Sequence, residues 1–298
     1  MRVPNFSYSN TLVSQLQSLT ARQTMLHNQV ATGQRITNPS DDPAATARVL
    51  RLQGEKQEIQ QFARNNDRAL NVSQSSFSTI KQLKTISDRA GELSVLGTGT
   101  ASPDALSAYG TEAGQMLEQA LQTANTQYAG EHLFGGTKTD TAPFTATRDA
   151  TGKITGVTYN GAANGAQIRV SEGSTVTPFT NGTQNQKLAD FMNNMVALRD
   201  ALQSGSVAAV QSKQAPLQTS ENDLLVTMSN IGATQTRLEA DRSQNEARFA
   251  DLENLTAAET DVNIPDTVVK LTQAQSAYQA ALQSGSKLLQ LSLMDYVR

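Results

Sequence analysis

Proline is absent between Pro43 and Pro103, and apolar residues recur along this stretch at helical spacing. Asp42 can cap such a helix, and Pro43 suits its first position because the missing N–H needs no partner there. A single helix over residues 44–97 would measure roughly 80 Å at about 1.5 Å per residue. That length exceeds most globular helices and favours a rod. The apolar stripe consists of Val49, Leu52, Ile59, Phe62, Leu70, Phe77, Ile80, Leu83, Ile86 and Leu93.

The N-terminal segment predicts another amphipathic helix, because its apolar residues alternate at steps of four and three. Gln23 fills the one polar slot in this seam, and Gly33 ends the helix because glycine readily takes positive φ. A turn-rich connector follows over residues 37–43. The seam residues are Leu12, Leu16, Leu19, Leu26 and Val30.

Helical periodicity returns in the second half of the chain. Residues 184–205 predict one helix, and a long helix is expected after Pro216. The segment from Asn263 to Pro265 breaks that helix, and a final helix follows. The apolar residues of the final helix are Val268, Leu271, Tyr278, Leu282 and Leu289.

The middle of the chain has a different character, rich in Gly, Thr and Pro from Gly130 to about Gly182. Two short alternating runs, residues 153–159 and 167–170, predict strands, and a turn is expected at Asn160 and Gly161. The expected fold class is therefore mainly α with a small β insert, built as an elongated antiparallel helical rod or coiled coil of both termini. The expected domains are a terminal helical domain (1–43 plus 262–298), a helical rod (44–129 plus 183–261) and a β-rich insert (130–182).

Composition excludes several classes of protein. The net charge of −3 gives no basic excess for nucleic-acid binding, and the absence of cysteine excludes disulfides and thiolate metal sites. No apolar run approaches the roughly 18 residues of a membrane span, and Met1 to Asn10 lack the apolar core of a cleavable signal peptide. Aromatic residues make up only 5% of the chain, so the core should be aliphatic and thin.

Neither terminal stripe is broad enough to be stable alone in water, so the two chain ends are expected to lie together. Their seams also contain polar residues, which weakens the pairing within one chain. We therefore expect the terminal helices to become fully ordered only when other subunits cover them.

The stretch from Val30 to Ala44 resembles the N-terminal signature of the flagellin family, and the C-terminal helix from Tyr278 onward is similar to that family's C-terminus. Residues 130–144 and 292–298 resemble the hook–filament junction branch, hook-associated protein 3, although His132 stands where that branch usually has Tyr. The matching N-terminal positions are Thr32, Gly33, Arg35, Ile36, Asp41, Asp42, Pro43 and Ala44.

This resemblance implies a flagellin-like structural subunit that joins hook to filament. The family implies export by the flagellar secretion apparatus without a cleaved signal peptide, and hence an extracellular location in the bacterial flagellum. It also implies that the terminal helices build an inner tube, the rod an outer wall, and the insert an outward face. The implied partners are further copies in a ring or layer, the other hook–filament junction protein, flagellin and an export chaperone.

No catalytic, metal or cofactor site is expected. His27 and His132 lie far apart in the sequence, and helix capping fully explains Asp41 and Asp42. The rival interpretations are a filament flagellin, a secreted coiled-coil adhesin or effector, and, with least support, an enzyme with its site in the insert. The predicted subunit interface comprises the seam residues of both terminal helices, and the family motif comprises Gly33, Arg35, Asp41, Asp42 and Pro43.

Overall fold

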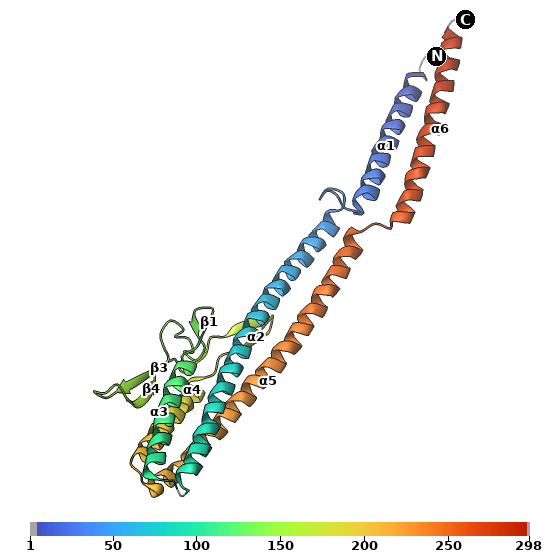
Figure 1. Ribbon diagram of the computed structural model, residues 1–298. Helices are drawn as coiled ribbons and strands as arrows, with labels where there is room; N and C mark the ends of the chain where they lie inside the picture. The colour runs from blue at the N-terminus through green and yellow to red at the C-terminus, as the bar shows by residue number, and fades with distance from the viewer. Residues whose placement is uncertain (1–4, 100, 297–298) are drawn as a thin grey trace. The chain divides into compact units, whose positions relative to one another are not determined.

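The computed structural model describes residues 5–99 and 101–296, with side chains described over 10–99 and 101–287. These residues form six helices and six short strands (Figure 1), which confirms the mainly helical fold class with a small β insert. The elements are α1 (Asn5–Thr32), α2 (Pro43–Gly97), α3 (Pro103–Ala124), β1 (Gln127–Tyr128), β2 (Glu131–His132), β3 (Phe144–Arg148), β4 (Ile154–Tyr159), β5 (Ile168–Ser171), β6 (Ser174–Val176), α4 (Gly182–Gln203), α5 (Val207–Thr260) and α6 (Ile264–Tyr296).

The chain divides into two compact units, and α2 and α5 contribute to both. The first unit comprises Met1–Glu58 with Phe249–Arg298, and the second comprises Ile59–Arg248. In the first unit α1 and α6 pack along each other (blue and red in Figure 1). The first turns of α2 and the last turns of α5 bury Ala45 and Leu252.

The main hydrophobic core of the second unit is shared by α2, α3, α4, α5, β3 and β4. Helices α3 and α4 can pack closely because Gly110 has no side chain. A Cβ at this position would clash with the backbone and side chain of Gln203. Gly97 is equally confined, since a Cβ there would lie 2.6 Å from Leu202 Cδ2. Fully buried large side chains fill the space between the helices, among them Phe134, Phe144, Phe191, Leu117, Leu188, Met192 and Met195.

The strands form three antiparallel pairs, β1–β2, β3–β4 and β5–β6. Positive φ at Ala129 and Gly130, 51° and 85°, turns the chain between β1 and β2. The β3–β4 hairpin closes at residues 149–153, where the Asp149 carboxylate accepts hydrogen bonds from the backbone N–H groups of Thr151 and Lys153.

Side chains of α4 hold the outer edge of β4. Asn193 accepts a hydrogen bond from the Val157 N–H (2.8 Å) and donates one to the Val157 carbonyl (2.9 Å), much as a neighbouring strand would. Buried Arg199 donates to the Ile154 carbonyl at 2.7 Å. These bonds satisfy backbone groups that an open strand edge would leave for another chain.

The β5–β6 hairpin packs on α2 and α5. Asn65 donates to the Arg169 carbonyl (2.8 Å), and Asn245 donates to the Val170 carbonyl (3.0 Å). Below the hairpin is a small separate core of Ala69, Leu70, Val170, Val176 and Leu238. The insert is thereby fixed to two helices that are distant in the sequence.

One local expectation, a long helix beginning after Pro216, was wrong. Helix α5 begins at Val207 and continues through Pro216, because burial of Val210 and Leu217 on either side offsets a cost of roughly 3 kcal/mol for an internal proline. Helix α3 ends at Ala124, where the side-chain amide of the next residue, Asn125, bonds the backbone of Phe144. The chain bends at Gly161, directly after the first predicted run, and β4 pairs with β3 while β5 pairs with β6.

Among the described residues, the helices all fall short of the length and apolarity that crossing a membrane requires.

The buried amide of Asn185 generates a stability prediction. It donates to the Phe134 carbonyl (2.9 Å) and to the Tyr159 hydroxyl (3.0 Å), and it accepts from Thr180. Asn185→Ala leaves buried polar groups without partners, so the free energy of unfolding should fall by about 3 kcal/mol. Chemical denaturation measures this, with the exposed helical Asn222→Ala as the matched control. Equal midpoints for the two variants would contradict the prediction.

Candidate assembly interface

The predicted seam of α1 faces α6 of the same chain. Leu26 is 7% exposed, and the other four seam residues are half-buried. Leu12 contacts α6 at Gly285, where an added Cβ would lie 2.5 Å from Leu12 Cδ2. The structure therefore places all five N-terminal seam residues on a helix pair within one chain.

The residues that α6 buries in the pair with α1 are only partly the predicted ones. Leu271 and Tyr278 are half-buried, whereas Val268 and Leu282 are 42% and 45% exposed. The side chain of Leu289 lies outside the described residues. The covered positions of α6 follow one another at steps of four and three, and most of them hold small residues. The six covered positions are Thr267, Leu271, Ala274, Tyr278, Ala281 and Gly285.

The sequence pattern of large apolar residues missed Thr267, Ala274 and Ala281. A search for small residues at the same alternating spacing would have found them, because small side chains let two helices approach closely. Val268 and Leu282 lie next to this seam rather than in it, which leaves them available to another molecule.

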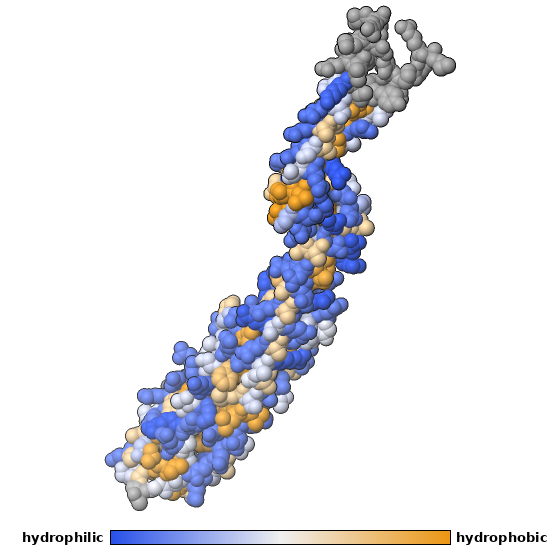
Figure 2. Space-filling view, turned by 90° about the vertical axis from the view of Figure 1, so that its right-hand side faces the viewer, coloured by the Kyte–Doolittle hydropathy of each residue, from blue (hydrophilic) through white to orange (hydrophobic). Residues whose placement is uncertain are grey.

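Several large apolar side chains of the first unit remain exposed. Monomeric proteins expose single apolar residues routinely, but a series along paired helices is typical of an interaction surface. Figure 2 shows on one face how apolar residues gather in small patches between polar ones. The exposed apolar residues of the terminal helices are Val13, Met25, Ile264, Val268, Val269 and Leu282.

The connector between α1 and α2 lies beside the break between α5 and α6. Gly33 has φ of +72°, and its N–H donates to the Gln29 carbonyl as α1 ends. The Arg35 N–H then donates to the Thr260 carbonyl (2.6 Å), and the Val262 N–H donates to the Gly33 carbonyl (3.0 Å). The two breaks, far apart in sequence, thus pair through their backbones.

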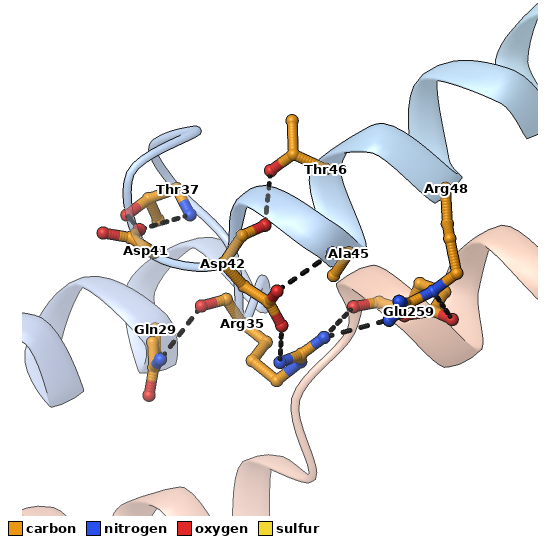
Figure 3. A network of polar contacts seen from close by, with 9 residues as sticks. All are labelled: Gln29, Arg35, Thr37, Asp41, Asp42, Ala45, Thr46, Arg48 and Glu259. Carbon is orange, nitrogen blue, oxygen red and sulfur yellow. Dashed lines mark hydrogen bonds and ion pairs between the residues drawn. The ribbon is translucent and has the colours of Figure 1, made fainter.

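Four charged side chains, Arg35, Asp42, Arg48 and Glu259, reinforce this pairing, and we call them the connector cluster (Figure 3). The Arg35 guanidinium donates to the Asp42 carboxylate at 3.2 Å and to the Glu259 carbonyl at 2.9 Å. Arg48 binds the Glu259 carboxylate through two hydrogen bonds of 2.8 and 2.9 Å. The bidentate geometry fixes the start of α2 against the end of α5.

The two adjacent aspartates have separate structural tasks. Asp42 caps α2 as predicted, accepting from the Ala45 N–H at 2.9 Å. Asp41 accepts from the N–H groups of Asn38 (2.8 Å) and Thr37 (3.1 Å), which closes the connector turn. Pro43 opens the helix, so each motif residue has a local structural role.

These hydrogen bonds favour the charged forms of the carboxyl groups. The Asn38 N–H lowers the pKa of Asp41, and the Ala45 N–H, helped by Arg35, lowers the pKa of Asp42 below 3.8. The Arg48 guanidinium lowers the pKa of Glu259 below its ordinary value of 4.5, and Glu259 in turn raises the pKa of Arg48.

No group of three or more His, Asp or Glu side chains in the described part of the chain could hold a metal ion. His27 is exposed on α1. His132 is buried, where one ring nitrogen lies 3.0 Å from the Asn125 carbonyl and the other 3.0 Å from the Gln127 amide. His132 therefore has a structural role in the turn between α3 and β2.

Comparison with known proteins shows what the chain is similar to. A family model described as the bacterial flagellin N-terminal helical region matches residues 4–139, which include the connector cluster residues Arg35, Asp42 and Arg48. Flagellar hook-associated protein 3 of Salmonella typhimurium is 27% identical over 292 residues, covering 92% of each chain. The resemblance to the flagellin family is confirmed.

The chain is also similar to proteins of other bacteria. Flagellar hook-associated protein 3 of Escherichia coli is 24% identical over 289 residues, 90% of each chain. The crystal structure of Bacillus cereus FlgL has the same fold, with a TM-score of 0.60, 21% identity, and coverage of 70% of this chain and 99% of that chain. The similarity to hook-associated protein 3 therefore spans the helical ends and the insert.

The lowered carboxyl pKa values generate a pH prediction. A group with a depressed folded pKa stabilises the fold above its unfolded pKa, and that stabilisation is lost as the pH falls through the folded pKa. The amide NMR signals of Thr37, Asn38 and Ala45 should therefore titrate with midpoints below 3.8. The Val157 amide, which neutral Asn193 holds, is the control and should not titrate in that range. Midpoints at or above 3.8 would show that the connector hydrogen bonds do not favour the carboxylates.

Proposed function

We propose that this chain is a structural subunit of the bacterial flagellum that joins the hook to the filament. The observation that carries the proposal is its similarity to flagellar hook-associated protein 3 over 92% of both chains. The paired chain ends with exposed apolar side chains support it, because such surfaces are suited to assembly. The function is geometric, and we infer no enzymatic activity.

In this proposal the terminal domain, residues 1–43 with 262–298, forms the inner tube of the assembly. Residues 44–129 with 183–261 form the helical rod of the outer wall, and residues 130–182 form the outward insert. The proposed partners are further copies in a ring or layer, the other hook–filament junction protein, flagellin and an export chaperone. Export would use the flagellar secretion apparatus and deliver the chain to the extracellular flagellum.

Nine of the ten predicted interface residues divide into two groups in this proposal, and the side chain of the tenth, Leu289, lies outside the described residues. Leu12, Leu16, Leu19, Leu26 and Val30 pair with Leu271 and Tyr278 inside one chain and present the helix pair as a unit. Val268 and Leu282 are exposed beside that seam and are the stronger candidates for contacts with neighbouring subunits. Burial of each such side chain stabilises the assembly by about 2 kcal/mol, and this gain recurs in every subunit.

A deletion strain tests the proposal. Loss of a junction protein should let flagellin leak into the medium and abolish motility, and the wild-type chain should restore both. A chain with Val268→Asp and Leu282→Asp should be exported with its helix pair intact but should not retain flagellin. Gln279→Asp, at an exposed polar position of α6, is the matched control and should restore retention.

The outcomes separate the rival functions. Complete absence of flagellar filament protein from cells and medium would identify the chain as filament flagellin. Normal filaments and motility in the deletion strain would favour a secreted adhesin or effector. Full retention of flagellin by the double aspartate variant would overturn the assignment of the exposed stripe to subunit contacts.

A further inference from the structure

Three Asn–Gly dipeptides occur in the chain, and all lie in or at the edge of the insert: Asn160–Gly161, Asn164–Gly165 and Asn181–Gly182. Asparagine followed by glycine is chemically vulnerable, because glycine lacks the Cβ that would hinder its backbone nitrogen from reaching the preceding side chain. Folding decides which of these pairs can react, since both reacting groups must be free to move.

In Asn181–Gly182 both residues are held by hydrogen bonds. The Asn181 side-chain oxygen accepts from the Gln184 N–H at 2.8 Å as the N-cap of α4, and Gln184 reciprocates in a capping box. The Gly182 N–H donates to the Ala163 carbonyl at 2.8 Å, and Gly182 is buried. Its nitrogen therefore cannot approach the Asn181 side chain without unwinding the helix end.

In Asn160–Gly161 only the asparagine is held by hydrogen bonds. The Asn160 amide donates to the Thr145 hydroxyl on β3 at 2.7 Å. Its backbone is also fixed, because the Asn160 N–H donates to the Pro143 carbonyl at 2.8 Å. The side chain must leave Thr145 before it can react.

Asn164–Gly165 lacks hydrogen-bond restraints on both reacting groups. Asn164 is exposed at a bend in the connection between β4 and β5. Within residues 5–99 and 101–296, neither its side-chain amide nor the Gly165 N–H has a hydrogen-bond partner. Rotation about the Asn164 side chain is therefore open to solvent and breaks no bond of the fold.

We propose that Asn164 is a site of spontaneous deamidation. The backbone nitrogen of Gly165 attacks Asn164 Cγ, and a new N–Cγ bond replaces the Cγ–Nδ2 bond. The peptide proton leaves with the side-chain nitrogen as ammonia, which yields a succinimide. Water then opens the succinimide at one of its two carbonyls and leaves an aspartyl or isoaspartyl residue at position 164.

The reaction changes a groove of about 430 Å³ between the insert, α4 and α5. Asn164 and Gly165 line this groove, and no described lining residue is charged, so the new carboxylate is its first charge. One side of the Gly165 Cα lies against neighbouring side chains, since an added Cβ would lie 2.6 Å from Thr177 Cγ2 and 2.9 Å from Phe179 Cβ, while its N–H has no hydrogen-bond partner among the described residues. The longer isoaspartyl backbone cannot keep this packing, so modification displaces the segment.

Peptide mapping by mass spectrometry tests the proposal on the full chain incubated at mildly alkaline pH. The mass change of amide-to-acid conversion should appear first at Asn164, at a rate several-fold above that at Asn160 and Asn181. In denaturant the three sites should react at similar rates, because the local sequence is then the main determinant. Isoaspartyl methyltransferase labelling of the same samples should mark position 164.

Two variants separate the tethering argument from sequence effects. Thr145→Ala frees the Asn160 amide and should raise its rate several-fold, while Asn164→Gln should abolish conversion at position 164 because the longer side chain disfavours ring closure. Equal rates at Asn164 and Asn181 in the folded chain would overturn the proposal. An unchanged Asn160 rate in folded Thr145→Ala would overturn the argument that the tether protects.

Discussion

The connector cluster joins the segment between α1 and α2 to the segment between α5 and α6. The first unit depends on this pairing. Two helices stop and two begin within this region, which leaves many backbone groups without helical partners. Gly33, Arg35 and Val262 satisfy several of them across the two breaks, and Asp42 caps α2. Glu259 joins this backbone pairing to Arg48, so the start of α2 and the end of α5 are held by ionic and hydrogen bonds rather than by a large core.

Much of the fold could be predicted from local sequence, because its signals are short-range. Gly33 and Asp42 mark helix ends through backbone geometry, and the α1 seam follows from large apolar residues at regular steps. The α6 seam was only partly predictable, since Ala274, Ala281 and Gly285 carry little hydrophobic signal. Glu259 gave no sequence signal at all, because its partner Arg48 lies 211 residues away. The family resemblance identified Arg35 as a motif residue but not its bond to the Glu259 carbonyl.

The two units are stabilised by different interactions. The second unit buries a continuous aliphatic and aromatic core and fixes its insert with amide side chains such as Asn193 and Asn245. The terminal helices instead pair through a narrow seam and leave Val268, Val269 and Leu282 exposed. A chain whose second unit has its own core and whose terminal helices leave apolar side chains exposed is suited to contacts with other molecules.

Trypsin cleavage after Arg35 tests most directly whether the connector cluster holds the chain ends together. Glu259→Gln weakens the ion pairs with Arg35 and Arg48. Glu253→Gln weakens only the ion pair with Lys56, whose atoms lie 3.4 Å apart, and serves as the control. Cleavage after Arg35 should become several-fold faster in Glu259→Gln and remain at the wild-type rate in Glu253→Gln. Equal cleavage rates in the two variants would contradict a role of Glu259 in holding the connector.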